Sequence, residues 1–211
     1  MFTVIMPIKP WDGAKSRLHA EADARRALAR AFAQDALDAV LRTPEVSRVV
    51  VVSGSEEVRE YALRIGATPI AEPESAGSDP LGTAVNLGAA WAIKNHPDDA
   101  LAIIPSDLPA LTSSELSSLL CEAVTHPRAF VPDTSGEGTT VLTSQRPDLL
   151  RPSYGLGSAE RHRSYGAVEL LAPAALRRDV DEFHELLEAQ TLGVGAHTTA
   201  ALTKVSTRAS A

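Results

Sequence analysis

Apolar runs of strand length alternate with amphipathic segments of helix length along the first 125 residues. The strand candidates are residues 2–8, 49–52, 68–71 and 100–104. The helix candidates are residues 23–42, 55–65, 82–95 and 112–124. The run Val49–Val52 is β-branched throughout, as expected for a central parallel strand that is covered on both faces. Thr112 and Glu115 have capping-box spacing, which predicts the start of the last of these helices.

This βαβαβαβα alternation predicts an α/β fold with a mostly parallel, doubly wound sheet. In such sheets ligands bind beyond the carboxyl ends of the strands. Functional side chains are therefore expected just after residues 8, 53 and 104.

The pattern loosens after residue 125. Further strand candidates are residues 129–132, 139–143 and 168–171, and further helix candidates are residues 157–165 and 182–190. The chain shows no internal repeat and no linker. We therefore expect a single domain over residues 1–203 and a flexible C-terminal tail over residues 204–211, where small polar residues dominate.

Composition and charge narrow the class of protein. Of the 211 residues, 44% are hydrophobic and 22% charged, which is typical of a folded globular chain. The net charge of −7 and the absence of a long basic run disfavour nucleic acid as a partner but leave room for a local basic pocket. A single cysteine, Cys121, excludes intramolecular disulfides. No apolar stretch is long enough for a membrane span and no signal peptide is evident, so a cytoplasmic location without a membrane partner is expected.

The segment after the first strand carries three cations, Lys9, Lys15 and Arg17, around Gly13. Such a strand-to-helix loop can hold a polyphosphate through backbone N–H groups and cationic side chains. It is not a Walker loop, because Ala14 stands where the glycine before the lysine belongs. A solvated, charged connection is an equal alternative.

Three aspartates are candidates for binding a divalent cation. Asp107 follows the strand at 100–104, at the expected ligand edge, and a carboxylate there suits a cation that binds phosphates. Asp179 and Asp181 are two residues apart, so in an extended segment both point to one side. The alternatives are a turn or capping role for Asp107 and a helix-capping role for Asp181.

Glycine and hydroxyl residues gather in residues 133–140 and 154–158, where tight turns can expose N–H and O–H donors to a small anion. Ordinary turn chemistry explains the same residues, and His162 behind them is expected to be structural. Gly82 and Asn86 open the helix at 82–95, where they could approach a base. Helix-start chemistry accounts for them equally well.

Together these segments resemble the CofC/FbiD family of guanylyltransferases, which act in the biosynthesis of the deazaflavin coenzyme F-420. The matching segments occur in the family's order and cover nearly the whole chain. They are residues 7–9, 15–18, 106–109, 136–140, 154–158 with His162, and 177–181. The resemblance implies a nucleotidyltransferase fold like that of the GT-A glycosyltransferases. It also implies that GTP condenses with a small phosphorylated three-carbon acid and that pyrophosphate is released.

The resemblance carries over to individual positions. The acids that match the family's metal-binding residues, for Mg²⁺, are Asp107, Asp179 and Asp181. The contacts of the acid substrate are Thr140, Gly155 and Ser158. The nucleotide-binding positions are Lys9, Lys15, Arg17, Gly82 and Asn86, and Asp107 and Lys15 are the expected catalytic residues. The chain departs from the family where Gly82–Asn86 replaces a fuller Gly-Gly-Leu-Asn run.

Other functions remain open from the sequence. A sugar-phosphate or molybdopterin-type nucleotidyltransferase could share this fold, as could a nucleotide-binding regulatory domain without catalysis. The acceptor could be phosphoenolpyruvate, 2-phospho-L-lactate or 3-phospho-D-glycerate, and on family grounds the Ala- and Arg-rich composition favours phosphoenolpyruvate. Both a monomer and a homodimer are compatible with the sequence.

Overall fold

One seven-stranded sheet organises the chain, which the computed structural model describes over residues 1–18, 20–73 and 79–209. The strands lie in the order β3-β2-β1-β4-β6-β5-β7. Their bounds are β1 Phe2–Pro7, β2 Val46–Ser53, β3 Thr68–Ala71, β4 Ala100–Ile103, β5 Arg128–Pro132, β6 Thr139–Ser144 and β7 Val168–Glu169.

The sheet is mostly parallel, as predicted. Strand β1 pairs in parallel with β2 and β4, and β2 with β3, whereas β6 runs antiparallel to both β4 and β5. The chain moves outward from β1 to β3 and then crosses to β4 on the other side of β1. A crevice is expected at such a reversal of strand order, beyond the carboxyl ends of the strands.

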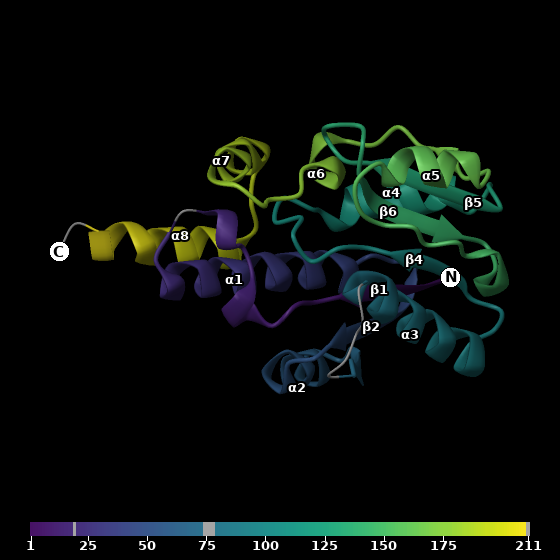
Figure 1. The fold of residues 1–211 in the computed structure, drawn as a ribbon, viewed down its shortest axis with the longest axis horizontal. Coiled ribbons are helices and arrows are strands. Elements are labelled where there is room, and N and C mark those ends of the chain that lie inside the picture. The colour runs from purple at the N-terminus through teal and green to yellow at the C-terminus, as the bar shows by residue number, and fades with distance from the viewer. Residues whose placement is uncertain (19, 74–78, 210–211) are drawn as a thin grey trace.

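Helices cover both faces of the sheet (Figure 1). Their bounds are α1 Ala22–Leu41, α2 Glu56–Arg64, α3 Pro80–Asn95, α4 Ser113–Ala123, α5 Ser158–Ser164, α6 Ala174–Arg177, α7 Phe183–Leu192 and α8 Ala196–Ala209. Three 3-10 turns are η1 Trp11–Gly13, η2 Ser16–Leu18 and η3 Pro147–Leu149. Within the described residues, no helix has the length and apolar content to cross a membrane.

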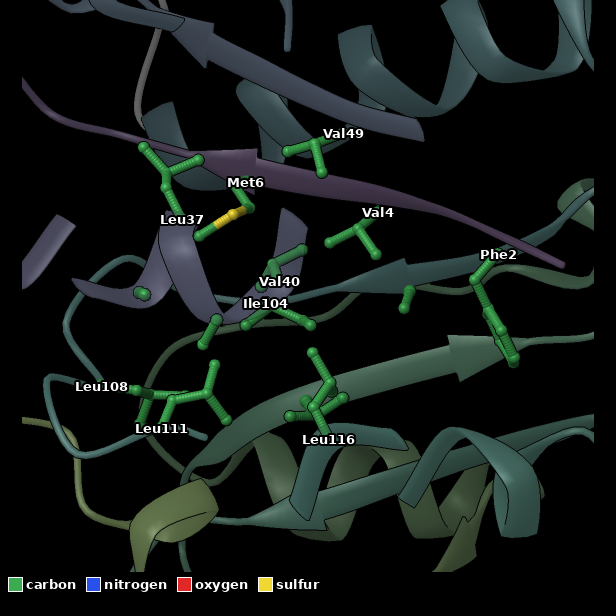
Figure 2. Close-up of a cluster of buried hydrophobic side chains, with 14 of the residues drawn as sticks. Phe2, Val4, Met6, Leu37, Val40, Val49, Ile104, Leu108, Leu111 and Leu116 are labelled. Atoms are coloured by element: carbon green, nitrogen blue, oxygen red, sulfur yellow. The ribbon is translucent and has the colours of Figure 1, made fainter. Parts of the chain in front are cut away.

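The core follows from the alternation of side chains along β1. Val4 and Met6 face the layer that contains α1, α2 and α4, whereas Ile5 faces the layer that contains α3 and α5. Figure 2 shows Val4 and Met6 in the same cluster as Leu37 and Val40 of α1. Because β1 is buried on both faces, its sequence is apolar except for Thr3, and its carboxyl end is fixed in the middle of the molecule.

Two parts of the C-terminal region differ from the sequence prediction. The short helix α6 was not expected, and residues 204–209 of the expected tail continue the helix α8. Residues 210–211 lie outside the described residues. Figure 1 shows α8 lying against α1. The Asp35 carboxylate of α1 accepts hydrogen bonds from the backbone N–H of His197 at 3.0 Å and of Thr198 at 2.8 Å. This capping by a distant residue explains why the local sequence of α8 did not reveal it.

Candidate active site

The loop after β1 is anchored by packing at two points. The buried Trp11 ring meets the Tyr61 ring edge-on, with 6.2 Å between centroids, and the Arg30 guanidinium lies 5.2 Å from the Trp11 centroid. Further along, Leu18 is buried in the cluster between α1, α7 and α8. Between these anchors Lys15 adopts a φ of 59°, a left-handed conformation that is uncommon for a residue with a side chain. The loop therefore holds Lys15 in a defined direction.

The Lys15 ammonium group joins two acids that are far apart in the sequence. Its Nζ atom lies 2.8 Å from Oδ2 of Asp107 and 2.8 Å from Oδ1 of Asp181. The Lys15 side chain is only 10% exposed. Burial alone would lower the pKa of Lys15, but the two carboxylates outweigh it and raise the pKa to about 12. Lys15 is thus a permanently charged group at this site.

The segment that carries the second pair of acids is attached to the loop after β4. The backbone N–H of Val180 donates to the carbonyl oxygen of Asp107 at 3.0 Å. The Glu185 carboxylate accepts from the backbone N–H of Asp181 at 2.7 Å and of Glu182 at 2.8 Å. Glu182 is the N-cap of α7, so the alternative helix-capping role for Asp181 is wrong. The Asp181 carboxylate is directed to Lys15 instead.

Asp179 belongs to the same electrostatic cluster. Burial, and next the charge of Asp107, raise the pKa of Asp179 to about 7, with a further contribution from Asp181. For Asp181 burial acts in the same direction, but the charge of Lys15 and its hydrogen bond prevail and lower the pKa. Within the described residues the cluster therefore contains two acids, Asp107 and Asp181, that share the Lys15 cation, and one acid, Asp179, without an ion-pair partner.

The predicted three-aspartate metal site is present as neighbouring charges but not as a closed ligand set. In the described part of the chain, no three metal-type side chains surround a common point. Lys15 supplies the positive charge between Asp107 and Asp181. Two features nevertheless suit a cation: within the described residues Oδ1 of Asp107 is buried without a hydrogen-bond partner, and Asp179 is half-buried among like charges. These two carboxylates are of the chemical type that a hard divalent ion takes as ligands.

A cavity of about 580 Å³ opens beside this cluster, at the carboxyl ends of the strands. It contains three of the predicted nucleotide-binding residues, Lys9, Lys15 and Arg17. Its other lining residues are Pro7, Ile8, Pro10, Trp11, Ala14, Ser16, Ala29, Val52, Glu72, Pro80, Leu81, Ala84, Pro105, Ser106, Asp107 and Asp181. Cationic groups and acids meet at one part of this cavity, and the cationic groups there can attract a phosphate.

The predicted base contacts, Gly82 and Asn86, are not among these lining residues. The backbone N–H of Gly82 donates to Asp79 at 2.9 Å, and a Cβ at Gly82 would lie 2.1 Å from the Asp79 carboxylate. Gly82 thus serves the N-terminal cap of α3. Asn86 is exposed on that helix. The helix-start explanation accounts for Gly82, and the wall of the cavity is formed by Pro80, Leu81 and Ala84 instead.

The predicted acid-substrate contacts lie on β6, in the loop before α5 and at the first residue of α5, and they do not line the cavity either. Thr140 is buried, and its hydroxyl donates to the carbonyl of Leu176 at 2.6 Å. Ser158 is also buried, and its hydroxyl donates to Oγ1 of Thr139 at 3.1 Å. Gly155 has a φ of 97°, which requires glycine. Both hydroxyls therefore have partners within the protein.

His162 has the structural role expected from the sequence. Its Nε2 atom accepts from the backbone N–H of Ser153 at 3.0 Å, so the proton is on Nδ1, which lies 2.9 Å from Oγ1 of Thr139. Burial, and next the charge of Arg161, lower the pKa of His162 to about 4. A neutral imidazole thus links the loop before α5 to β6.

Glu72, directly after β3, is a cavity residue that the sequence analysis missed. Its position could have been predicted, because the rule that ligands bind beyond the carboxyl ends of parallel strands applies to β3 as it does to the other strands. Residues 74–78 of the segment that follows Glu72 lie outside the described residues.

Comparison with protein families matches residues 2–209 to the family described as guanylyl transferase CofC like. A protein of Streptomyces coelicolor named phosphoenolpyruvate guanylyltransferase is 40% identical over 203 residues, which cover 94% of each chain. A protein of the same name from Streptomyces scabiei is 41% identical over 209 residues, or 97% of each chain. Phosphoenolpyruvate guanylyltransferase 2 of Rhodococcus jostii is 38% identical over 198 residues, 93% of this chain and 88% of the relative.

Solved structures with low sequence identity share the fold. A 4-diphosphocytidyl-2C-methyl-D-erythritol synthase superposes with a TM-score of 0.62 at 12% identity, covering 90% of this chain and 98% of that one. A nucleotidyl transferase from Methanothermobacter gives a TM-score of 0.59 at 16% identity, with 91% and 97% covered. The predicted nucleotidyltransferase fold is thereby confirmed.

Proposed function

The chain belongs to the family of CofC-like guanylyl transferases, and from this premise we propose that it transfers GMP from GTP to the phosphate of phosphoenolpyruvate. Pyrophosphate is the second product, and the reaction is a step in coenzyme F-420 biosynthesis, as the sequence resemblance implies. The observation that carries the proposal is the cavity in which Lys9, Lys15 and Arg17 meet Asp107 and Asp181.

The reaction needs charge compensation rather than a protein nucleophile. A phosphate oxygen of the acceptor attacks the α-phosphorus of GTP, and the bond from that phosphorus to the bridging oxygen of the β-phosphate breaks. Both reactants are anions, so positioned cations lower the barrier. Lys15 and Arg17 line the cavity and can bind the departing β- and γ-phosphates, while Lys9 offsets further negative charge.

Asp107, Asp179 and Asp181 are the residues that would hold Mg²⁺. Oδ1 of Asp107, which has no hydrogen-bond partner among the described residues, and the half-buried Asp179 carboxyl support this assignment. When bound, the ion would offset the charge of the phosphates that react. In its absence Lys15 neutralises part of the cluster through its two ion pairs.

The loop before α5 supports binding of the acid substrate through backbone groups. The Arg161 guanidinium donates to the carbonyl of Tyr154 at 2.8 Å and to that of Leu156 at 2.6 Å. In a trans peptide plane the N–H points opposite to the C=O, so the N–H groups of Gly155 and Gly157 are directed away from Arg161. Successive N–H groups in such a loop can bind a carboxylate or phosphate. Thr140 and Ser158 would contribute to binding of the acid substrate through their positions beside this loop.

Pyrophosphate release tests the proposed function. The purified chain is mixed with GTP and, in turn, phosphoenolpyruvate, 2-phospho-L-lactate, 3-phospho-D-glycerate and a sugar phosphate. We expect release with GTP and phosphoenolpyruvate, together with a product whose mass is that of the GMP–phosphoenolpyruvate conjugate.

Asp107→Asn is the matched control, because it keeps the size of the side chain and should lower the rate by about 100-fold or more. Release with the sugar phosphate alone would indicate a sugar-phosphate nucleotidyltransferase. Nucleotide binding without any release would indicate a regulatory domain, and either result would overturn the proposal.

A further inference from the structure

Glu72 places a carboxylate at the edge of the cavity where β3 ends. Its backbone N–H donates to the carbonyl of Ser53 at 3.2 Å, which extends the pairing of β3 with β2 by one residue. Side chains two residues apart share a face of a strand, and Ile70 packs on the face covered by α3. Glu72 therefore lies on that face, where Pro80 and Leu81 of α3 also line the cavity.

The carboxylate of Glu72 is not used by the fold. Of the three acids that line the cavity, Asp107 and Asp181 form ion pairs with Lys15. Glu72 is half-buried, and within the described ranges its carboxylate takes part in no ion pair or side-chain hydrogen bond. A carboxylate in that position is available to accept hydrogen bonds from a ligand.

The strand order separates Glu72 from the phosphate-binding end of the cavity. From β3 to β4 the sheet crosses β2 and β1, so three strand spacings of about 4.8 Å, or about 14 Å in all, separate the ends of these two strands. Asp107 follows β4 and Glu72 follows β3. This span is comparable with the length of a nucleotide. A nucleotide whose phosphates lie at Lys15 and Asp107 therefore directs its base toward Glu72, Val52 and Leu81.

Guanine is the base whose chemistry suits a carboxylate there. Its Watson–Crick edge presents two adjacent donors, N1–H and N2–H, which match the two oxygens of one carboxylate. Adenine presents a lone pair at N1 beside the N6 amino group, and cytosine a lone pair at N3, so each would repel one oxygen. Hypoxanthine keeps N1–H but lacks the amino group. Charge-assisted, paired hydrogen bonds of this kind give strong discrimination.

We propose that Glu72 is the residue that selects guanine, by accepting hydrogen bonds from N1–H and N2–H through its two carboxylate oxygens. This inference rests on the proposed function, in which GTP is the donor nucleotide. It replaces the expected base contacts of Gly82 and Asn86, which do not line the cavity.

The test compares Glu72→Gln with wild type for GTP, ITP and ATP, each with phosphoenolpyruvate. The glutamine amide keeps the size of the side chain but presents a donor to one of the guanine donors. We expect kcat/KM for GTP to fall at least tenfold, mainly through KM, as the loss of one hydrogen bond to a charged group predicts. The ratio of kcat/KM for GTP to that for ITP should fall toward one.

Glu60→Gln is the control, because Glu60 is exposed on α2 and does not line the cavity. It should leave the GTP-to-ITP ratio unchanged.

Calorimetric Kd values for GTP and ITP supply a readout that does not depend on turnover. If wild type binds GTP but releases no pyrophosphate, the proposed reaction fails while the Kd ratio still tests Glu72. Glu72→Ala is measured in parallel, so that a folding defect in one variant leaves the other. A folded variant of either kind that retains the wild-type GTP-to-ITP ratio overturns the inference.

Discussion

Lys15 and Asp179 show how the candidate site distributes charge among single residues. Lys15 forms ion pairs with both Asp107 and Asp181, whereas Asp179 is half-buried beside both acids and has no ion-pair partner among the described residues. A carboxyl whose pKa is raised in the folded state costs stability once it is ionised. The raised pKa of Asp179 therefore lowers the stability of the folded protein when the carboxyl is ionised, in an arrangement that suits a cation and phosphates.

Asp179→Asn should stabilise the metal-free protein while abolishing its activity. With a pKa of about 7 when folded and a reference value of 3.8, the destabilising effect of Asp179 is absent below pH 4, grows as pH rises, and is complete above pH 7. At pH 8 the variant should gain about 1–3 kcal/mol in free energy of unfolding, since each pKa unit corresponds to about 1.4 kcal/mol. Urea unfolding at pH 4, 6 and 8 measures the gain.

Asp98→Asn is the control for this variant, because Asp98 is exposed in the turn before β4. It should leave both stability and activity close to wild type. A gain for Asp179→Asn that is equal at pH 4 and pH 8 would contradict the assigned titration.

The helices α1 and α8 show how an element can depend on a residue that is distant in sequence. The N-terminal N–H groups of α8 are capped by Asp35, which is 6% exposed and belongs to α1. The chain before α8 passes so close to this carboxylate that a Cβ at Gly195 would lie 2.3 Å from its Oδ1 atom. The cap therefore joins the C-terminal helix to the layer that supports the loop of Lys15.

Asp35→Ala should lower the free energy of unfolding by about 2–4 kcal/mol, because two backbone N–H groups lose their acceptor. Thermal and urea unfolding measure this loss. The control, Asp23→Ala, removes an exposed carboxylate in the first turn of the same helix and should cost less than about 1 kcal/mol. Equal effects of the two substitutions would show that the cap does not hold α8.

At the level of secondary structure, the sequence predicted most of the helices and strands but not all of them. The helix over 23–42 and the strand at 68–71 correspond to α1 and β3, because their apolar spacing is set locally by burial. The sequence of α8 is rich in Ala and Thr, and the helix is capped by Asp35 and packs against α1. Tertiary contacts of this kind leave no local pattern.

For the whole molecule, the strand order brings residues from four distant segments to one edge of the sheet. Lys15, Glu72, Asp107 and Asp181 follow different elements, and the placement of β1 between β2 and β4 gathers them around one cavity. The net charge of −7 makes this local group of cations necessary for binding a triphosphate.

Divalent-ion dependence is a prediction about the assembled site. Removal of metal with EDTA should reduce pyrophosphate release to background, and added Mg²⁺ should restore it, because three acids and two anionic substrates leave an excess of negative charge that a divalent cation would offset. Calorimetric titration of Mn²⁺ gives a second readout, and Asp107→Asn should weaken that binding at least tenfold. Full turnover in excess EDTA would refute the role assigned to the three acids.

The sequence by itself determined the alternation of strands and helices, the edge at which ligands bind and the identity of the charged residues there, since burial and strand direction impose local patterns. Tertiary structure decided which of those residues meet. It places Lys15 between Asp107 and Asp181, leaves Gly82 and Asn86 outside the cavity lining, and places Glu72 in that lining. The physical reason is that side-chain proximity across a sheet follows from strand order and packing, which no single segment encodes.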